Sequence, residues 1–385
     1  MTSATDNVSP RDRTREDLYQ LVRNGNEVTR SELAQLAGLS RSTVNHAVGR
    51  LLAEGRIVEA EARTKGRGSG SGRPGVSLSA VASGAPVAGI DFGHSHVTVA
   101  VADRLGRELG RGHLVLDVDL NARDAMDFAA ETMRQLREEH SIDHLSSVVA
   151  GVPGPIDSRT GTVRSPTILM SWVGLAPGQE LQARLGVPVH IENDAVLGAY
   201  GEQQAGAGRH HSDFLYVKAS DGIGASMVLN GRSYTGANGL AGEIGHTKLP
   251  GRTELCRCGD LGCLEAVISV KAVREQIAHT HPSSDQQKVQ IHEFQDAVTD
   301  RILNEAGRTL GRPLAELCNL LNPSALIIGG ELGAAGKALI DGVEASVRRH
   351  AQPATAANIE ILAAELSVRA ELTGAIRLAA ELASR

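Results

Sequence analysis

Residues 29–55 read TRSELAQLAGLSRSTVNHAVGRLLAEG, and this stretch decides the fold of the front of the chain. Thr29 and Glu32 have the spacing of a capping box, which predicts that a helix begins directly after Thr29. A Gly-Leu pair then forms a turn, and Ser40 is placed to cap a second helix over residues 41–54. Two helices joined by such a turn predict a helix-turn-helix.

The helix over residues 41–54 has an apolar and a polar face. Val44, Val48 and Leu51 recur at the spacing of a buried helix side. The opposite side carries hydrogen-bonding groups, which a recognition helix needs in order to contact base edges in the major groove. The residues predicted to contact DNA are Ser40, Arg41, Ser42, Thr43, Asn45, His46 and Arg50.

A basic loop follows this helix. Residues 56–60 alternate like a strand, a Gly/Ser/Arg segment comes next, and residues 76–78 resemble a second strand, which together predict a wing. The wing residues expected to contact phosphates or a minor groove are Arg63, Lys65, Arg67 and Arg73. Residues 1–80 are therefore predicted to form a mainly α winged helix-turn-helix. The alternative is a small helical interaction module whose polar face is only solvated.

The distribution of charge agrees with this division. The whole chain of 385 residues has a net charge of −6, but residues 1–80 hold 12 Lys and Arg against 9 Asp and Glu. The front is thus +3 and the remainder −9, so contacts with nucleic acid are expected at the front. The first residues are polar, and no apolar run is long enough to span a bilayer, so we expect a cytoplasmic protein without a membrane partner.

The rest of the chain predicts an α/β domain. Residues 81–86 form a short Ala/Ser/Gly/Pro linker, and a new domain is expected over residues 87–385. Buried-strand patterns there alternate with helical ones and are joined by glycine-rich turns. This alternation predicts sheets covered by helices, with the glycine-rich turns gathered around a cleft.

Three of the four cysteines crowd into eight residues. Cys256, Cys258 and Cys263 follow a C-x-C-x4-C spacing, and His246 lies a short loop upstream. Three thiols and one imidazole complete a tetrahedral set, for which Zn²⁺ is the natural ion. We expect one structural zinc ion per chain. Cys318, on a Leu-rich helix, is expected to be an ordinary core residue.

Several motifs of residues 87–385 occur together and in a characteristic order. They are Asp91-Phe92-Gly93, Gly151-Val152-Pro153-Gly154-Pro155, Glu192-Asn193-Asp194-Ala195, Glu243-Ile244-Gly245-His246, the run from Cys256 to Glu265, and Asn322-Pro323 with Gly329-Gly330.

In these motifs the domain resembles the ROK family of bacterial sugar kinases and sugar-responsive repressors. The resemblance implies a two-lobed, actin-like ATPase fold of the ribonuclease H type. Lobe 1 is expected at about 87–200 with the C-terminal helix 370–385, and lobe 2 at about 201–369.

The resemblance also implies a sugar site. The residues that it places against the sugar are Asn193, Asp194, Glu243, His246 and Glu265. Carboxylates and an amide suit paired hydrogen bonds to vicinal hydroxyls. One nitrogen of His246 would bind zinc while the other side of the ring faces the sugar. The family commonly has an Asn in the loop at residues 165–167, where this chain has Thr167.

The phosphate loops depart from those of the kinases. The resemblance makes Asp194 the former catalytic base, but the first loop, D-x-G-G-T in the kinases, is here Asp91-Phe92-Gly93-His94-Ser95. The second, G-T-G-x-G-x-G in the kinases, is here Ser220-Asp221-Gly222-Ile223-Gly224-Ala225-Ser226. An imidazole at His94 and a carboxylate at Asp221 oppose the close approach and negative charge of a triphosphate. We therefore predict loss of ATP binding and no kinase activity.

Together these features predict a sugar-responsive repressor of genes for carbohydrate uptake or catabolism. A homodimer or a tetramer would place paired recognition helices on two half-sites of a double-stranded operator. Sugar binding is expected to close the cleft between the lobes and to release DNA. The alternatives are a bifunctional or residual ATP-dependent sugar kinase and a DNA-bound scaffold whose sensor is inactive.

Overall fold

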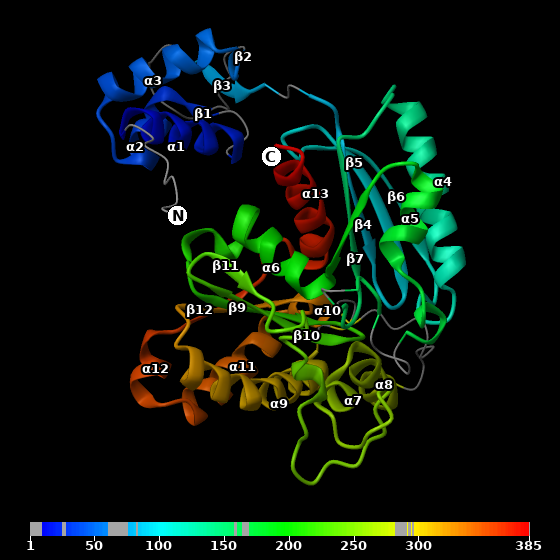
Figure 1. The fold of residues 1–385 in the computed structure, drawn as a ribbon. Helices are drawn as coiled ribbons and strands as arrows, with labels where there is room; N and C mark the ends of the chain where they lie inside the picture. Colours follow the sequence, from blue (N-terminus) through cyan, green and yellow to red (C-terminus); the bar gives the residue numbers. More distant parts are fainter. Residues whose placement is uncertain are drawn as a thin grey trace, which may run out of the picture. The chain divides into compact units, whose positions relative to one another are not determined.

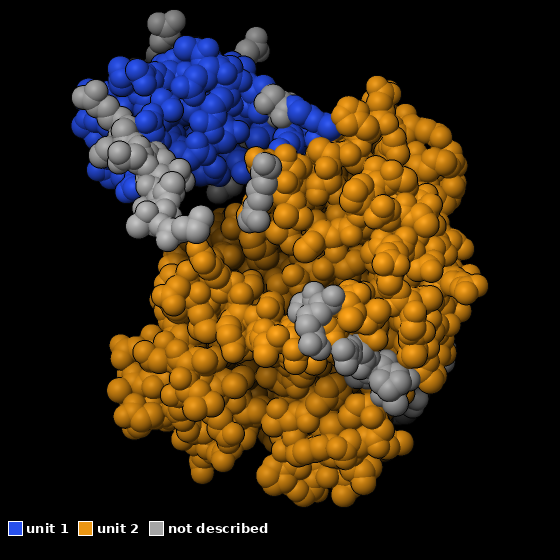
Figure 2. All heavy atoms as spheres, viewed as in Figure 1, with its two compact units in different colours: residues 1–85, 103–107 blue, residues 86–102, 108–385 orange. Residues whose placement is uncertain are grey.

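The computed structural model describes residues 10–24, 28–60, 76–81, 84–157, 160–163, 169–281, 291, 294 and 296–384. The chain divides into two compact units, which Figure 2 shows in different colours. Unit 1 is Met1–Ala85 with Asp103–Arg107, and unit 2 is Pro86–Ala102 with Glu108–Arg385. In the described part of the chain, no helix is long and apolar enough to cross a membrane.

Unit 1 combines helices with a small antiparallel sheet (Figure 1). Its elements are α1 (Pro10–Asn24), β1 (Val28–Thr29), α2 (Arg30–Ala37), α3 (Arg41–Ala53), β2 (Ile57–Ala60) and β3 (Ser77–Ala80). The sheet has the order β1-β3-β2, so β1, which the sequence pattern did not indicate, pairs with the strand beyond the wing. The predicted wing residues Arg63, Lys65, Arg67 and Arg73 lie outside the described residues.

Both predicted helix caps are present. The Thr29 hydroxyl accepts a hydrogen bond from the backbone N–H of Glu32 at 3.2 Å, and the Glu32 carboxylate accepts one from the backbone N–H of Thr29 at 2.8 Å. The Ser40 hydroxyl likewise accepts from the backbone N–H of Thr43 at 3.2 Å. Gly38 between the helices has φ 63°, a left-handed conformation that ends α2 and turns the chain into α3. The helix-turn-helix geometry is thus set by local hydrogen bonds.

Unit 2 contains two five-stranded mixed sheets, which define its lobes (Figure 1). Lobe 1 has the order β6-β5-β4-β7-β8 and lobe 2 the order β11-β10-β9-β12-β13. In lobe 1, β4 pairs antiparallel with β5 and parallel with β7. In lobe 2, β9 pairs antiparallel with β10 and parallel with β12, so both lobes have the same topology. The loops β4–β5 and β9–β10, which contain the phosphate-loop motifs, therefore occupy equivalent positions in the two lobes.

The strands of lobe 1 are β4 (Val87–Phe92), β5 (His96–Ala102), β6 (Glu108–Val115), β7 (Ser147–Val152) and β8 (Val189–Asn193). Helices α4 (Ala122–Glu139) and α5 (Pro177–Leu185) pack beside them. The strands of lobe 2 are β9 (Phe214–Ala219), β10 (Ile223–Leu229), β11 (Arg232–Tyr234), β12 (Ala325–Gly329) and β13 (Glu360–Ala363). Its main helices are α7 (Leu264–Ile268), α8 (Val270–Thr280), α9 (Ala297–Leu321), α10 (Gly330–Gly333), α11 (Lys337–His350) and α12 (Pro353–Asn358).

Two further helices, α6 (Asp194–Ala205) and α13 (Ala370–Leu382), pack very closely against each other. A Cβ atom at Gly201 would lie 2.3 Å from the carbonyl oxygen of Ala370, and one at Gly374 would lie 1.9 Å from that of Leu197. Only glycine permits this approach of the two backbones. The packing fixes the position of α6, whose first residue is Asp194.

Candidate functional site

The exposed face of α3 is the candidate DNA-contacting surface. All seven residues predicted for this role are exposed, namely Ser40, Arg41, Ser42, Thr43, Asn45, His46 and Arg50. The Ser40 hydroxyl lies 2.9 Å from the hydroxyl oxygens of both Ser42 and Thr43, so it also organises the first turn. The buried side of the helix, with Val44 and Val48 completely inaccessible, holds this polar face outward.

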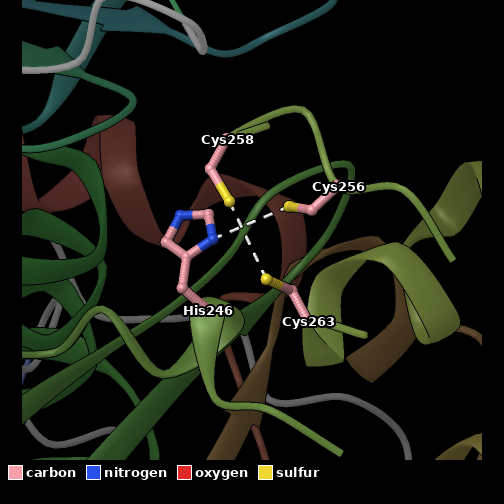
Figure 3. Close-up of side chains that lie close together, drawn as sticks. All are labelled: His246, Cys256, Cys258 and Cys263. Atoms are coloured by element: carbon pink, nitrogen blue, oxygen red, sulfur yellow. Dashed lines mark hydrogen bonds between the residues drawn. The ribbon is translucent and has the colours of Figure 1, made fainter. Parts of the chain in front are cut away.

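The predicted metal ligands come together in lobe 2 (Figure 3). Ligand atoms of His246, Cys256, Cys258 and Cys263 all lie within 4.8 Å of one another. The sulfur atoms of Cys258 and Cys263 are 3.8 Å apart, and Nδ1 of His246 is 3.7 Å from the sulfur of Cys256. Tetrahedral bonds of about 2.3 Å would separate two thiolates by roughly 3.8 Å, so the spacing fits zinc. These residues could hold a metal ion.

The surroundings of this His/Cys cluster suit a thiolate-rich centre. The Lys248 ammonium donates to the sulfur of Cys263 at 3.2 Å and lies 2.6 Å from a carboxylate oxygen of Asp260. A nearby cation offsets the negative charge that three thiolates bring to one ion. Nε2 of His246 points away from the sulfurs and lies 3.8 Å from Oε2 of Glu243. The His246 ring thus stands between the cluster and one of the predicted sugar residues. Cys318 is completely buried, as expected for a core residue.

Asn193 and Asp194 lie at the junction of β8 and α6. The Asn193 side chain caps α6 by accepting from two backbone N–H groups, and its Nδ2 donates to the carbonyl oxygen of Gly154 at 3.1 Å. Asp194 is buried; its Oδ1 accepts from the backbone N–H of Ala195 at 2.7 Å. The junction therefore connects the Gly-Val-Pro-Gly-Pro loop with the start of α6.

The other two predicted sugar carboxylates come from lobe 2. Glu265, near the start of α7, is buried and its Oε2 accepts from the backbone N–H of Ile223 at 3.0 Å. Glu243 precedes a short 3₁₀ turn that contains His246. Partial burial, together with the negative charges of Asp194 and Glu265, raises the pKa of Glu243 to about 7.

Histidine rings cover glycines in both phosphate loops. A Cβ atom at Gly93 would lie 2.2 Å from the His96 ring, and one at Gly222 would lie 2.6 Å from Nε2 of His94. His96 in turn lies 3.1 Å from Oδ2 of Asp91, which is buried at the end of β4. The first loop therefore reaches the second through His94. The role of His96 was not predicted from the sequence.

Lys218 is a further residue that sequence reasoning missed. It lies at the end of β9, is buried, and its ammonium is 2.6 Å from Oδ2 of Asp194. Although burial opposes its charged form, the carboxylates of Asp194, Glu371 and Asp91 raise the pKa of Lys218 above its usual range. A lysine inside the otherwise apolar segment FLYVKA was the available signal.

Arg257 and Asp119 were not predicted either. Arg257 lies between two of the cysteines, and its Nη1 is 3.0 Å from Oδ2 of Asp119 in lobe 1. Its Nη2 donates to the backbone carbonyl of Asp221 at 3.2 Å. Asp221 thus takes part in an arginine contact through its backbone. Thr167 lies outside the described residues.

Residues 87–382 match the family model described as the ROK family, and residues 11–58 match the model described as a winged helix-turn-helix DNA-binding domain. The xylose repressor of Bacillus spizizenii is 27% identical over 360 residues, covering 93% of this chain and 92% of that relative. The similarity therefore extends through both units.

Two solved structures share the fold. A ROK family transcriptional regulator, described as a homologue of the E. coli MLC protein, has a TM-score of 0.67 and 23% identity and covers 97% of both chains. A ROK family glucokinase from Streptomyces griseus, in complex with glucose and AMPPNP, has a TM-score of 0.68 and 28% identity, covering 77% of this chain and 99% of that one. The predicted fold, a winged helix-turn-helix with a two-lobed ATPase-like domain, is confirmed.

Proposed function

Because the chain belongs to the ROK family, we propose that it is a sequence-specific DNA-binding repressor controlled by a monosaccharide. The observation that carries this proposal is the presence of a winged helix-turn-helix and a ROK domain in one chain. A relative that aligns with 93% of this chain is named a xylose repressor. Genes of carbohydrate uptake or catabolism are the proposed targets.

The DNA-binding role rests on the polar face of α3. Asn45 and His46 offer hydrogen-bonding groups, and Arg41 and Arg50 offer positive charge, on the exposed side of the helix. Such groups can contact base edges and phosphates when a recognition helix enters the major groove. A homodimer, alone or within a tetramer, would present two such helices to an operator with two half-sites.

The proposed sugar site consists of Asn193, Asp194, Glu243, His246 and Glu265. Its support is the approach of His246 to Glu243 at 3.8 Å, together with the burial and the negative charges of Asp194 and Glu265 that raise the pKa of Glu243. Carboxylate oxygens accept hydrogen bonds from sugar hydroxyls, and an analogue that lacks a hydroxyl would leave them unpaired. Binding to both lobes would favour one interlobe arrangement and so alter the DNA-competent population.

A structural zinc ion, one per chain, is proposed for His246, Cys256, Cys258 and Cys263. The thiol spacing of 3.8 Å between Cys258 and Cys263 supports this assignment. The ion would hold the loop between His246 and α7, and Glu265 lies in the first turn of α7. It would thereby orient residues on the sugar side of lobe 2.

Two observations favour a second candidate function, ATP-dependent sugar phosphorylation. Asp194 is retained, and a similar ROK glucokinase was solved with glucose and AMPPNP. Against this candidate, Asp194 is paired with Lys218 at 2.6 Å, so a proton taken from a sugar would have to disturb a buried ion pair. Imidazoles also cover glycines in both phosphate loops. We therefore propose that the chain does not transfer phosphate.

The deciding experiment is an electrophoretic gel shift of the full-length protein on DNA from upstream of its own coding sequence. We expect binding that weakens with salt, and release by one of D-xylose, D-glucose or N-acetyl-D-glucosamine. Glu243→Gln should need more sugar for release but bind DNA as the wild type does. Indifference of wild-type binding to all three sugars would contradict the proposal. Sugar-dependent turnover of ATP, abolished by Asp194→Asn, would instead establish the kinase.

A further inference from the structure

Four polar side chains, three of them charged, form a continuous series of contacts from lobe 1 to lobe 2, here called the interlobe chain. Nδ1 of His94 lies 2.7 Å from Oδ1 of Asp119, and Nη1 of Arg257 lies 3.0 Å from the other oxygen, Oδ2. Nε of Arg257 is 3.5 Å from Oε1 of Glu265. His94 and Asp119 belong to lobe 1, whereas Arg257 and Glu265 belong to lobe 2. The two lobes are therefore joined by the ion pair of Asp119 and Arg257 and by the side chains bonded to it.

The members of the interlobe chain are largely shielded from water. The side chains of His94 and Asp119 are 13% and 18% exposed, that of Arg257 is 29% exposed and that of Glu265 is 8% exposed. Charge pairs in such positions are screened less by salt than pairs on an open surface. They also have defined geometry, because Asp119 uses a different oxygen for each of its two partners. A change in the position of one member of the interlobe chain therefore affects the next member.

Glu265 connects the interlobe chain to the proposed sugar site. Its Oε2 already accepts from the backbone N–H of Ile223 at 3.0 Å, whereas Oε1 faces Arg257 at the longer distance of 3.5 Å. A sugar hydroxyl that donates to Oε1 would share that oxygen with the guanidinium of Arg257. Sugar binding would consequently alter the pairing of Arg257, and Arg257 is the group that contacts lobe 1.

The second phosphate loop is held by the same groups. Arg257 donates to the backbone carbonyl of Asp221, and the His94 ring fills the space beside Gly222. The two loops that resemble the phosphate loops of the kinases are thus in contact with each other through His94, and Arg257 bonds the second of them. This region is therefore built for contact between the lobes.

We propose that Arg257 is a positioning residue of the sugar response. It orients Glu265 and conveys the occupancy of that carboxylate to lobe 1 through Asp119 and His94. This inference rests on the proposed function, because it names the groups through which sugar at that site is sensed by the other lobe. The contact between the former phosphate loops changes when sugar binds. The lobes have one arrangement with this contact and another without it, and the two arrangements have different affinities for DNA.

The protein contains a natural reporter of this contact. Trp172 is its single tryptophan, and its indole N–H donates to the carbonyl of Val118 at 2.8 Å. The neighbouring Ser171 hydroxyl donates to the carbonyl of Asp119 at 2.9 Å. Rearrangement at Asp119 should therefore change the fluorescence of Trp172.

The test uses full-length protein, the upstream DNA fragment, and D-xylose, D-glucose and N-acetyl-D-glucosamine as probes. Calorimetry measures sugar affinity, tryptophan fluorescence measures the response of lobe 1, and fluorescence anisotropy of labelled DNA measures release. The variants are Asp119→Asn and Arg257→Gln. The matched control is Arg252→Gln, which changes an arginine of the same loop that is 48% exposed and pairs with Glu254.

We expect Asp119→Asn to bind sugar about as well as the wild type but to lose the fluorescence change. The sugar concentration for half-release of DNA should rise roughly 5- to 150-fold, the usual range of an allosteric coupling. Arg257→Gln should lose both the fluorescence change and part of the sugar affinity, with unchanged metal content. Arg252→Gln should behave as the wild type.

The outcomes separate this inference from the proposed function. If the wild type responds to a sugar and both variants release DNA at the same sugar concentration as the wild type, the role of Arg257 is refuted and the repressor assignment stands. If the wild type responds to none of the sugars, both are refuted. Asp119 is not one of the candidate metal ligands, so its variant leaves all four side chains of the His/Cys cluster in place.

Discussion

Two groups of residues in unit 2 differ in what surrounds their polar groups. The sugar side is the proposed sugar site with Glu243 and Glu265, and the phosphate side is the two phosphate loops with Lys218. On the sugar side, the Glu243 side chain is 37% exposed, and Glu265 directs one oxygen toward a loosely spaced arginine. On the phosphate side, His94 and His96 cover glycines, and the buried Lys218 pairs with Asp194 at 2.6 Å. The chain thus covers its phosphate loops with its own rings, whereas Glu243 on the sugar side keeps a partly exposed carboxylate. This difference is one reason for our proposal that the domain binds a sugar but no nucleotide.

Removing the proposed zinc ion should have the largest effect, because it tests the support of the whole sugar side. Cys258→Ser takes away one of four ligands, and structural zinc contributes on the order of 10 kcal/mol in small metal-dependent folds. We expect loss of bound metal, a much lower melting temperature and no sugar response. Mass spectrometry under native conditions and thermal unfolding measure these quantities.

Cys318→Ala, which changes a buried cysteine outside the cluster, should keep its metal. Retention of metal and sugar response in Cys258→Ser would contradict the assignment.

Replacing Lys218 should have the next largest effect, because it removes the internal cation of the phosphate side. Lys218→Met would leave Asp194 buried without its partner, and breaking a buried pair typically costs about 3–5 kcal/mol. Chemical denaturation followed by circular dichroism measures this loss. The matched control is Lys337→Met, which removes a lysine that also pairs with an aspartate but is 84% exposed. We expect the control to cost less than about 1 kcal/mol. Equal effects of the two variants would show that the Lys218 pair contributes no more than a surface pair.

A methyl group at Gly222 tests the contact between the two phosphate loops. Its Cβ would lie 2.6 Å from Nε2 of His94, so Gly222→Ala should destabilise the protein by about 1–3 kcal/mol, as overpacking does. The double variant with His94→Ala should recover most of this loss. Gly224→Ala is the matched control, because its Cβ would meet the nearest atom at an ordinary 3.4 Å. Additive effects of Gly222→Ala and His94→Ala would indicate that the imidazole does not occupy this space.

The features that the sequence predicted depend on local spacing. The capping box of Thr29 and Glu32 joins groups three residues apart, and the ligands Cys256, Cys258 and Cys263 lie within one loop. The interlobe contact between Asp119 and Arg257 joins residues 138 positions apart and depends on how two sheets are brought together. No periodicity in the sequence contains that information.

The phosphate-side lysine could be predicted only in part. Lys218 is conspicuous in an apolar strand, but the sequence does not show that β9 ends beside the first turn of α6, where Asp194 lies. Asp194 becomes the partner of Lys218 because α6 packs against the sheet of lobe 2. Similarly, Gly222 resembles a retained phosphate-loop glycine in the sequence, whereas in the fold it faces the ring of His94.

The smallest predicted effect concerns the pH dependence of the first phosphate loop. Although burial opposes protonation of His96, its hydrogen bond to Asp91 and the charge of that carboxylate raise the pKa of His96 above the usual 6.5. The protonated ring therefore stabilises the folded state fully below pH 6.5, and this contribution is lost as the pH rises through the folded-state pKa.

His96→Gln should consequently cost more stability at pH 6 than at pH 9, with a difference of about 1 kcal/mol, the net contribution of a typical hydrogen bond. Urea denaturation of both proteins across this range measures the difference. The charge of Lys218 also stabilises the ionised form of Asp91. In a Lys218→Met background Asp91 has one cation fewer, so the stability lost on His96→Gln should depend more strongly on pH. A constant difference between wild type and His96→Gln at every pH would mean that His96 covers Gly93 as a neutral ring. His96 would then contribute packing but no charge, and Lys218 would be the cation that stabilises the ionised form of Asp91.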